Sequence, residues 1–201
     1  PPHVLPVVQQ FLQEMAGGAA PAIPTLLHPR LANHLLKVIE RVDPSKARGI
    51  GAMLRNTVSP TMLSAGSKVN VIPSKASAHI DGRVIPGQTI AQFLDEIRSV
   101  IGPDLEITVH EQHEGVMFSS DTPLYTAIAL KVAKHAPEAT VVPYMVPGFT
   151  DAFAYARLGA TCYGFAPVKL PANLDFTKMF HGHDERIPVD GFLWGTEVLC
   201  D

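Results

Sequence analysis

The sequence predicts a mixed α/β protein that begins with a ferredoxin-like (α+β) domain and continues into part of a layered α/β domain. The 18 prolines and 15 glycines among 201 residues imply many turns, which disfavours a helical bundle. The first half follows the order helix, strand, strand, helix, strand, which becomes the split β-α-β-β-α-β unit if one further strand precedes residue 1. The second half alternates helices with strands, as layered α/β domains do.

Hydrophobic spacing and turn residues define the elements of the first half. Apolar residues over 4–15 recur on one helical face, and Gly17-Gly18 end that helix. Polar and apolar residues alternate over 76–85, as in a strand with one buried face. Thr89 is placed to cap the helix that follows the Pro86-Gly87 turn. The predicted elements are helices over 4–15 and 31–42, strands over 61–65 and 76–85, a helix over 89–100 and a strand over 105–110.

In the second half, residues that start and stop helices mark the elements. Pro123 stands in the first turn of one predicted helix, and Gly159 ends another. The predicted elements are a helix over 121–135, a strand over 140–146, a helix over 150–158, a strand over 160–165 and a helix from 189 onward. We expect residues 1–112 to form the first domain and residues 113–201 to belong to the second.

Composition excludes several classes of function. Lys and Arg number 16 against 19 Asp and Glu, a net charge of −3, so neither a nucleic-acid partner nor a membrane partner is expected. No apolar run approaches the roughly 18 residues of a membrane-spanning helix. The two cysteines, Cys162 and Cys200, are too few for a disulfide framework, so a reducing compartment such as the cytoplasm is expected.

The loop from Phe180 to Ile187 is the first candidate site. It holds His181 and His183 together with acidic residues, and neutral imidazole is a good zinc ligand that a carboxylate can orient. Two histidines cannot complete a zinc site, however. A polar loop that caps the last helix therefore stays open as the alternative.

Two further candidates have groups that can bind a carboxylate or a carbonyl oxygen. In the turn before residue 152, Gly148 permits close backbone approach and Thr150 can cap the helix start, where an anion is favoured. Arg83 can hold a carboxylate with two hydrogen bonds, and Asn70 can donate to a carbonyl oxygen. An ordinary helix cap, a turn asparagine and an Arg83–Asp81 ion pair are the alternatives at these positions.

A second histidine-rich stretch is not expected to bind metal. His110-Glu111-Gln112-His113-Glu114 lacks the H-E-x-x-H spacing and lies at the end of a predicted strand rather than on a helix.

The chain carries four short motifs in a fixed order, and together they resemble the C-terminal half of one enzyme family. The motifs are Asn70-Val-Ile-Pro, Asp81-Gly-Arg83 with Pro86-Gly87, Gly148-Phe-Thr-Asp-Ala and His181-x-x-Asp-Glu-Arg186. The family consists of zinc exopeptidases and amidohydrolases. Its members include aminoacylase, glutamate carboxypeptidase, carnosinase-type dipeptidases, acetylornithine deacetylase and succinyl-diaminopimelate desuccinylase. The resemblance extends from about residue 58 to residue 200.

The resemblance implies a two-domain enzyme that cleaves an amide bond beside a free carboxylate. In that family an α/β catalytic domain binds two zinc ions that activate a bridging water, and a ferredoxin-like lid domain mediates dimerisation. Residues 1–112 then correspond to the lid, and residues 113–201 to the last part of the catalytic domain. The implied substrates are small N-acyl amino acids or short peptides, and the implied assembly is a homodimer through the lid.

The same resemblance assigns roles to single residues. His181, four positions before Glu185, matches the C-terminal zinc ligand of the family. Asn70 matches a lid residue that reaches the substrate, in some members across the dimer, and Arg83 matches an arginine that binds the substrate carboxylate. Gly148 and Thr150 match the turn beside the substrate.

The remaining zinc ligands of the family and its general-base glutamate are not recognisable in this chain. We therefore expect the chain to be a fragment of a longer enzyme and to be inactive by itself. Two alternatives stay open at this stage. One is a non-catalytic dimerisation or binding module, and the other is a related enzyme that uses cobalt or manganese.

Overall fold

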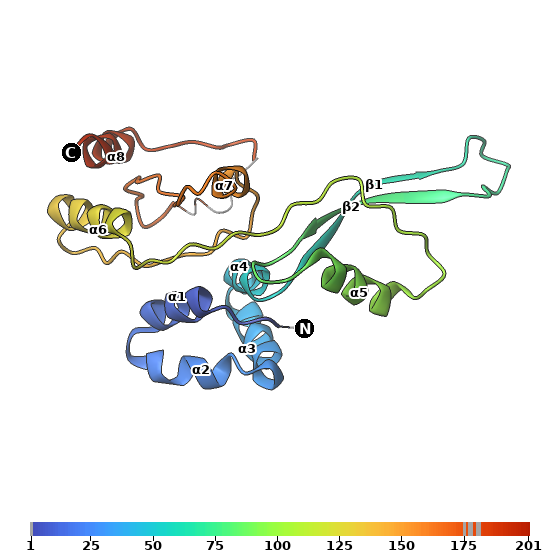
Figure 1. Ribbon diagram of the computed structural model, residues 1–201, viewed down its shortest axis with the longest axis horizontal. Helices are drawn as coiled ribbons and strands as arrows, with labels where there is room; N and C mark the ends of the chain where they lie inside the picture. Colours follow the sequence, from blue (N-terminus) through green and yellow to red (C-terminus); the bar gives the residue numbers. More distant parts are fainter. Residues whose placement is uncertain (1, 175, 177–178, 180–181) are drawn as a thin grey trace. The chain divides into compact units, whose positions relative to one another are not determined.

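The computed structural model describes residues 2–174, 176, 179 and 182–201, which form a mixed helix-and-strand structure (Figure 1). The helices are α1 (Pro6–Ala16), the 3-10 helix η1 (Gly17–Ala22), α2 (Ile23–Leu26), α3 (Pro29–Val42), α4 (Pro44–Leu54), α5 (Ile90–Ile101), α6 (Pro123–His135), α7 (Ala152–Ala156) and α8 (Val189–Cys200). The strands are β1 (Thr57–Ala65) and β2 (Ala76–Arg83).

The chain divides into two compact units. The first unit runs to Met117 and includes Val142–Thr161, and the second contains Phe118–Val141 and Cys162–Asp201. Among the described residues, no helix combines the length and the apolar character needed to cross a membrane. The expected domain boundary after residue 112 stays a prediction.

The N-terminal helices of the first unit pack around a small hydrophobic core. Val8 on α1, Leu27 after α2, Leu36 on α3, and Met53 and Leu54 on α4 are buried and in mutual contact. Apolar side chains removed from water in this way supply most of the stability of short helices. This core therefore holds the four helices together.

Asp43 both ends α3 and begins α4. Its Oδ1 accepts hydrogen bonds from the backbone N–H groups of Ser45 and Lys46, each at 3.1 Å. The Lys46 N–H lowers the pKa of the Asp43 carboxyl more than any other contact. Pro44 fits the first helical position because that position needs no N–H donor. The helix over 44–54 was not among the predicted elements, although the pair Asp43-Pro44 is a helix-start signal as well as a stop signal.

Strands β1 and β2 form an antiparallel hairpin with a bulge between Pro60 and Met62. Thr57 pairs with Arg83 at one end, and Ala65 pairs with Ala76 next to the connecting loop. All residues of β2 are exposed, but at Gly82 the strand meets α5, where the ring of Phe93 packs directly over the glycine. A Cβ atom on Gly82 would lie 2.6 Å from this ring, so only glycine allows the close approach.

Glu96 on α5 joins three separate segments of the first unit. Its Oε1 lies 2.8 Å from His3 Nε2, and its Oε2 accepts a hydrogen bond from Asn56 Nδ2 at 3.0 Å. Burial raises the pKa of Glu96, but the hydrogen bonds from Asn56 and His3 outweigh it, and the net pKa is lowered. The Asn56 Oδ1 accepts in turn from the Ile85 N–H, which joins the segments that enter and leave the hairpin at its open end.

The second unit contains α6 and α8, which are linked through polar contacts. Asp201 Oδ2 lies 2.5 Å from Lys134 Nζ and 3.3 Å from His135 Nε2. These hydrogen bonds lower the pKa of the Asp201 carboxyl to about 2. On α8, Gly191 and Gly195 lie against the carbonyl oxygens of Lys169 and Pro167, where a Cβ atom would overlap the backbone.

Three of the predicted strands are wrong. Residues 105–110, 140–146 and 160–165 adopt no regular secondary structure, and within the described part of the chain only β1 and β2 form a ladder. Apolar runs favour strands, but a strand forms only where a neighbour pairs with its backbone N–H and C=O groups. The helix–strand–strand–helix order of the first domain is confirmed, whereas the layered α/β part is not.

Candidate functional site

Arg83 and Asn70 lie at opposite ends of the hairpin. Arg83 ends β2, and its Nε donates to Asp81 Oδ2 at 2.8 Å, with both side chains about half exposed. Asn70 lies in the exposed loop between the strands. Seven residue steps of about 3.4 Å separate Arg83 from Ala76 beside that loop, or about 24 Å. One chain therefore does not bring these two side chains to the same substrate.

Gly148 and Thr150 lie in the turn that precedes α7. Thr150 Oγ1 accepts a hydrogen bond from the Ala152 N–H at 3.4 Å, as a helix-capping side chain does. The Asp151 side chain makes no capping hydrogen bond. Gly148 has room for a Cβ atom, since the nearest side-chain atom, on Val146, would lie 3.4 Å away. The structure therefore gives no steric reason for glycine at this position.

The same turn contacts a histidine that the sequence analysis set aside. The His113 ring lies 5.5 Å from the ring of Phe149 and 4.2 Å from that of Phe153. Its Nε2 is 2.8 Å from Glu111 Oε1, whereas its buried Nδ1 has no hydrogen-bond partner. His113 thus packs against the turn and the start of α7 through ring contacts. No spacing rule could have found this role, because the partners are about 40 residues away along the chain.

A cavity of about 390 Å³ lies beside this aromatic cluster. The guanidinium of Arg157 stands over the Phe153 ring, 5.6 Å from its centre. The cavity is lined by Ile90, Gln112, Glu114, Val116, Phe153, Ala156 and Arg157.

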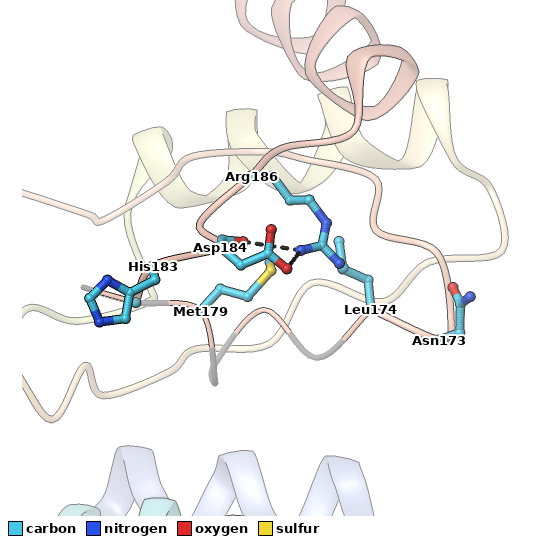
Figure 2. A pocket seen from close by; sticks show the side chains of 7 residues that line it. Asn173, Leu174, Met179, His183, Asp184 and Arg186 are labelled. Carbon is cyan, nitrogen blue, oxygen red and sulfur yellow. Dashed lines mark hydrogen bonds and ion pairs between the residues drawn. The ribbon is translucent and has the colours of Figure 1, made fainter.

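The second unit has a cavity of about 350 Å³ beside the loop that follows residue 181 (Figure 2). Arg186 lines it and pairs with Asp184 through both the side-chain carboxylate and the backbone carbonyl. Figure 2 shows the imidazole of His183 directed away from this ion pair. The predicted zinc ligand, His181, lies outside the described residues.

A metal centre needs several ligands that converge on one point. Over 2–174, 176, 179 and 182–201, no three His, Cys, Asp or Glu side chains are grouped so that they could hold an ion. These residues do not form a metal site by themselves.

Comparison with known proteins identifies the first domain. Residues 13–109 match the family model described as the peptidase dimerisation domain of M20 peptidases. This range includes α3, α4, the hairpin and α5 and lies within residues 1–112, for which a lid or dimerisation domain is expected. No solved structure matches the chain.

Several curated proteins are similar to a larger part of the chain. A probable carboxypeptidase S-like 2 of Dictyostelium discoideum is 30% identical over 77% of this chain and 30% of its own length. The N-fatty-acyl-amino acid synthase/hydrolase PM20D1 of Mus musculus is 32% identical over 70% of this chain and 29% of its own length. A putative succinyl-diaminopimelate desuccinylase DapE of Mycobacterium tuberculosis is 25% identical over 81% of this chain and 43% of its own length.

These matches support the M20 peptidase family for this chain, and the resemblance based on the four motifs is confirmed at 25–32% identity. The relatives are peptidases and hydrolases, and the family is generally metal-dependent. The chain spans about 30% of the length of the first relatives it matches.

Proposed function

We propose that this chain is part of a metal-dependent amidohydrolase that cleaves an amide bond next to a free carboxylate. The observation that carries the proposal is the dimerisation-domain match over 13–109, combined with motifs for carboxylate binding at Arg83 and for a metal ligand at His181. N-acyl amino acids and short peptides are the proposed substrates. Two zinc ions are the proposed cofactor, with cobalt or manganese as alternatives. The general-base glutamate is expected outside residues 1–201, the isolated chain is expected to be inactive, and the cytoplasm is the proposed location.

In this proposal the residues of the chain bind and orient the substrate. Arg83 holds the substrate carboxylate, and Asp81, 2.8 Å from Arg83 Nε, keeps the guanidinium oriented until the substrate arrives. Asn70 donates to a carbonyl oxygen of the substrate. Because Asn70 and Arg83 lie far apart on the hairpin, we propose that Asn70 reaches the substrate held by the other subunit of a homodimer. Gly148 and Thr150 belong to the turn proposed to lie beside the bound substrate.

The metal ligand is tested with the full-length enzyme that contains this chain. We expect His181→Ala to lose bound zinc and at least about 99% of the turnover of N-acetyl amino acids or dipeptides, since loss of one of few ligands disrupts a zinc site. His183→Ala, in the same loop, is the matched control and should keep both. Metal content is measured after chelation and again after zinc is restored. If His181→Ala binds zinc and turns over substrate like the unmodified enzyme, the ligand assignment is wrong.

The carboxylate-binding role of Arg83 predicts a change in substrate preference. Arg83→Gln should raise KM for substrates with a free carboxylate by about tenfold or more, since charge-assisted hydrogen bonds contribute about 1.5–3 kcal/mol. The same variant should leave KM for the corresponding carboxamides unchanged. If Arg83→Gln changed KM equally for the carboxylate and the carboxamide substrates, Arg83 would not be the residue that binds the carboxylate.

The second candidate function is a non-catalytic dimerisation module. The dimerisation-domain match favours it as much as it favours the enzyme, because that match covers the lid alone. An H-x-D motif and an adjacent Glu-Glu pair in the coding sequence upstream of residue 1 would support the enzyme, and their absence would support the module.

A further inference from the structure

Helix α3 carries apolar and basic side chains in two neighbouring rows, most of which are exposed. Residues spaced by four, three and four positions share one face of a helix. The first such row is apolar and consists of Leu31, Leu35, Val38 and Val42. The second row is basic and consists of Arg30, His34, Lys37 and Arg41.

The apolar row is not part of the hydrophobic core. The core face of α3 is formed by Ala32 and Leu36, which are buried. In the apolar row, by contrast, Leu35 is partly buried, and Leu31 is 42% exposed, Val38 57% and Val42 84%. The apolar surface of α3 is therefore wider than the part that packs against the other helices.

The basic row borders the apolar row on the side away from the core. Successive residues of a helix are rotated by about 100° around its axis. Around α3, the apolar row therefore lies between the other two faces: the basic row is about 100° from it in one direction, and the buried face is about 100° from it in the other. All four basic-row side chains are exposed. Glu40, the only acidic residue of the helix, falls on the far side of the basic row. Positive charge is thus concentrated along one edge of an exposed apolar surface.

We propose that this face of α3 docks on an anionic lipid surface. Helices that lie in the membrane interface combine an exposed aliphatic face with flanking Lys and Arg, whose charges meet anionic headgroups. The aliphatic row would enter the headgroup boundary while the basic row stays at the phosphate level. The net charge of the whole chain is close to zero, and for that reason the composition predicts no membrane partner. A net charge does not reveal the positive charge that is concentrated on this one face of α3. The proposal is independent of the proposed catalytic function.

Charge favours lipid over a second copy of the chain as the occupant of this surface. If α3 paired in antiparallel fashion with α3 of another copy, the two basic rows would lie along the same edge of the pair and repel each other, and Glu40 alone would not neutralise them. An anionic bilayer presents negative charge continuously and requires no matching groove.

The test is co-sedimentation of the full-length protein with vesicles. Vesicles of phosphatidylcholine alone are compared with vesicles that also contain phosphatidylserine, at low and at high salt. We expect binding to the anionic vesicles only, and weaker binding at high salt. Removing two cations should weaken binding at least about tenfold, since each Lys or Arg near an anionic surface contributes about fivefold.

Paired variants separate the two rows. Lys37→Gln with Arg41→Gln removes two positive charges but keeps the apolar row. Val38→Gln with Val42→Gln removes two apolar side chains but keeps the positive charges. Both pairs should lose binding. Glutamine is a good helix former, so exposed sites should tolerate it, and thermal unfolding checks this. The control is Val100→Gln on α5, which matches Val42 in exposure at 84% and should bind normally.

Several outcomes would overturn the proposal. They are failure of the unmodified protein to bind anionic vesicles, equal binding to neutral vesicles, and full binding by the Lys37 and Arg41 variant. A concentration-dependent dimer that these variants abolish, with no vesicle binding, would assign the surface to a second copy instead. The test measures vesicle binding and not catalytic activity. A negative result would therefore contradict the lipid proposal without bearing on the proposed function.

Discussion

At the scale of single residues, close packing makes Gly82 sensitive to the smallest substitution. We expect Gly82→Ala to destabilise the protein by about 1–3 kcal/mol, since the new Cβ would meet the Phe93 ring at 2.6 Å. Urea unfolding measures this change. In a Phe93→Leu background the cost should shrink, because the smaller side chain leaves room for the methyl group. An equal cost in both backgrounds would show that the ring is not the cause.

Glu96 gives the stability a pH dependence. Because its pKa is lowered in the folded protein from 4.5, its stabilising contribution is complete above pH 4.5 and is lost as the pH falls through the folded-state pKa. The difference in unfolding free energy between the protein and Glu96→Gln should therefore shrink as the pH falls below about 4.5. Urea titrations at a series of pH values measure this difference. The exposed Glu106→Gln serves as control and should show no such trend.

At the scale of elements, Asp43 starts helix α4. Asp43→Ala removes the acceptor for two backbone N–H groups and should cost about 1 kcal/mol of unfolding free energy. Asp104→Ala, in an exposed turn, is the control and should change stability by less than about 0.5 kcal/mol. Chemical denaturation of the three proteins compares them directly. Equal stability of both variants would exclude capping by Asp43.

Helix α8 requires glycine where it contacts the segment around Pro167. An alanine inside a helix normally adds about 0.5–1 kcal/mol over glycine. At Gly195 the methyl group would overlap the Pro167 carbonyl oxygen, so Gly195→Ala should instead destabilise by about 1–3 kcal/mol. Gly49→Ala on α4, with nothing within 4 Å, should stabilise. Thermal or urea unfolding distinguishes these opposite signs, and stabilisation by Gly195→Ala would contradict the packing.

At the scale of the whole molecule, the dimerisation-domain match suggests a homodimer. We expect the hairpin to contribute, because Leu63 on β1 is 81% exposed, and a lysine there discourages strand pairing. Leu63→Lys should therefore raise the monomer fraction measured by sedimentation. Leu158→Lys, at 83% exposure, is the matched control outside the hairpin. A dimer unaffected by Leu63→Lys would exclude this part of the hairpin from the interface.

Most helices of this protein could be predicted from local signals alone. The helix over 123–135 has its predicted end at His135. Helix α5 has its predicted Thr89 cap, and the Thr89 N–H in turn donates a hydrogen bond to the Gln92 side-chain oxygen. Helices satisfy their own backbone within a few residues, so spacing and capping residues are sufficient evidence. The family, too, was predicted correctly from four motifs, because motif order along the chain needs no knowledge of contacts.

Other features depend on contacts that only the folded chain reveals. The segment 140–146 has the composition of a strand but no strand ladder, because ladder hydrogen bonds come from another segment. The contact of His113 with Phe149, and the separation of Asn70 from Arg83 along the hairpin, likewise depend on how distant segments meet. The sequence by itself determined most of the local helices, the hairpin and the family. The tertiary structure alone decided which extended segments paired, which glycines were sterically required and which apolar side chains stayed exposed, because each depends on atoms far away along the chain.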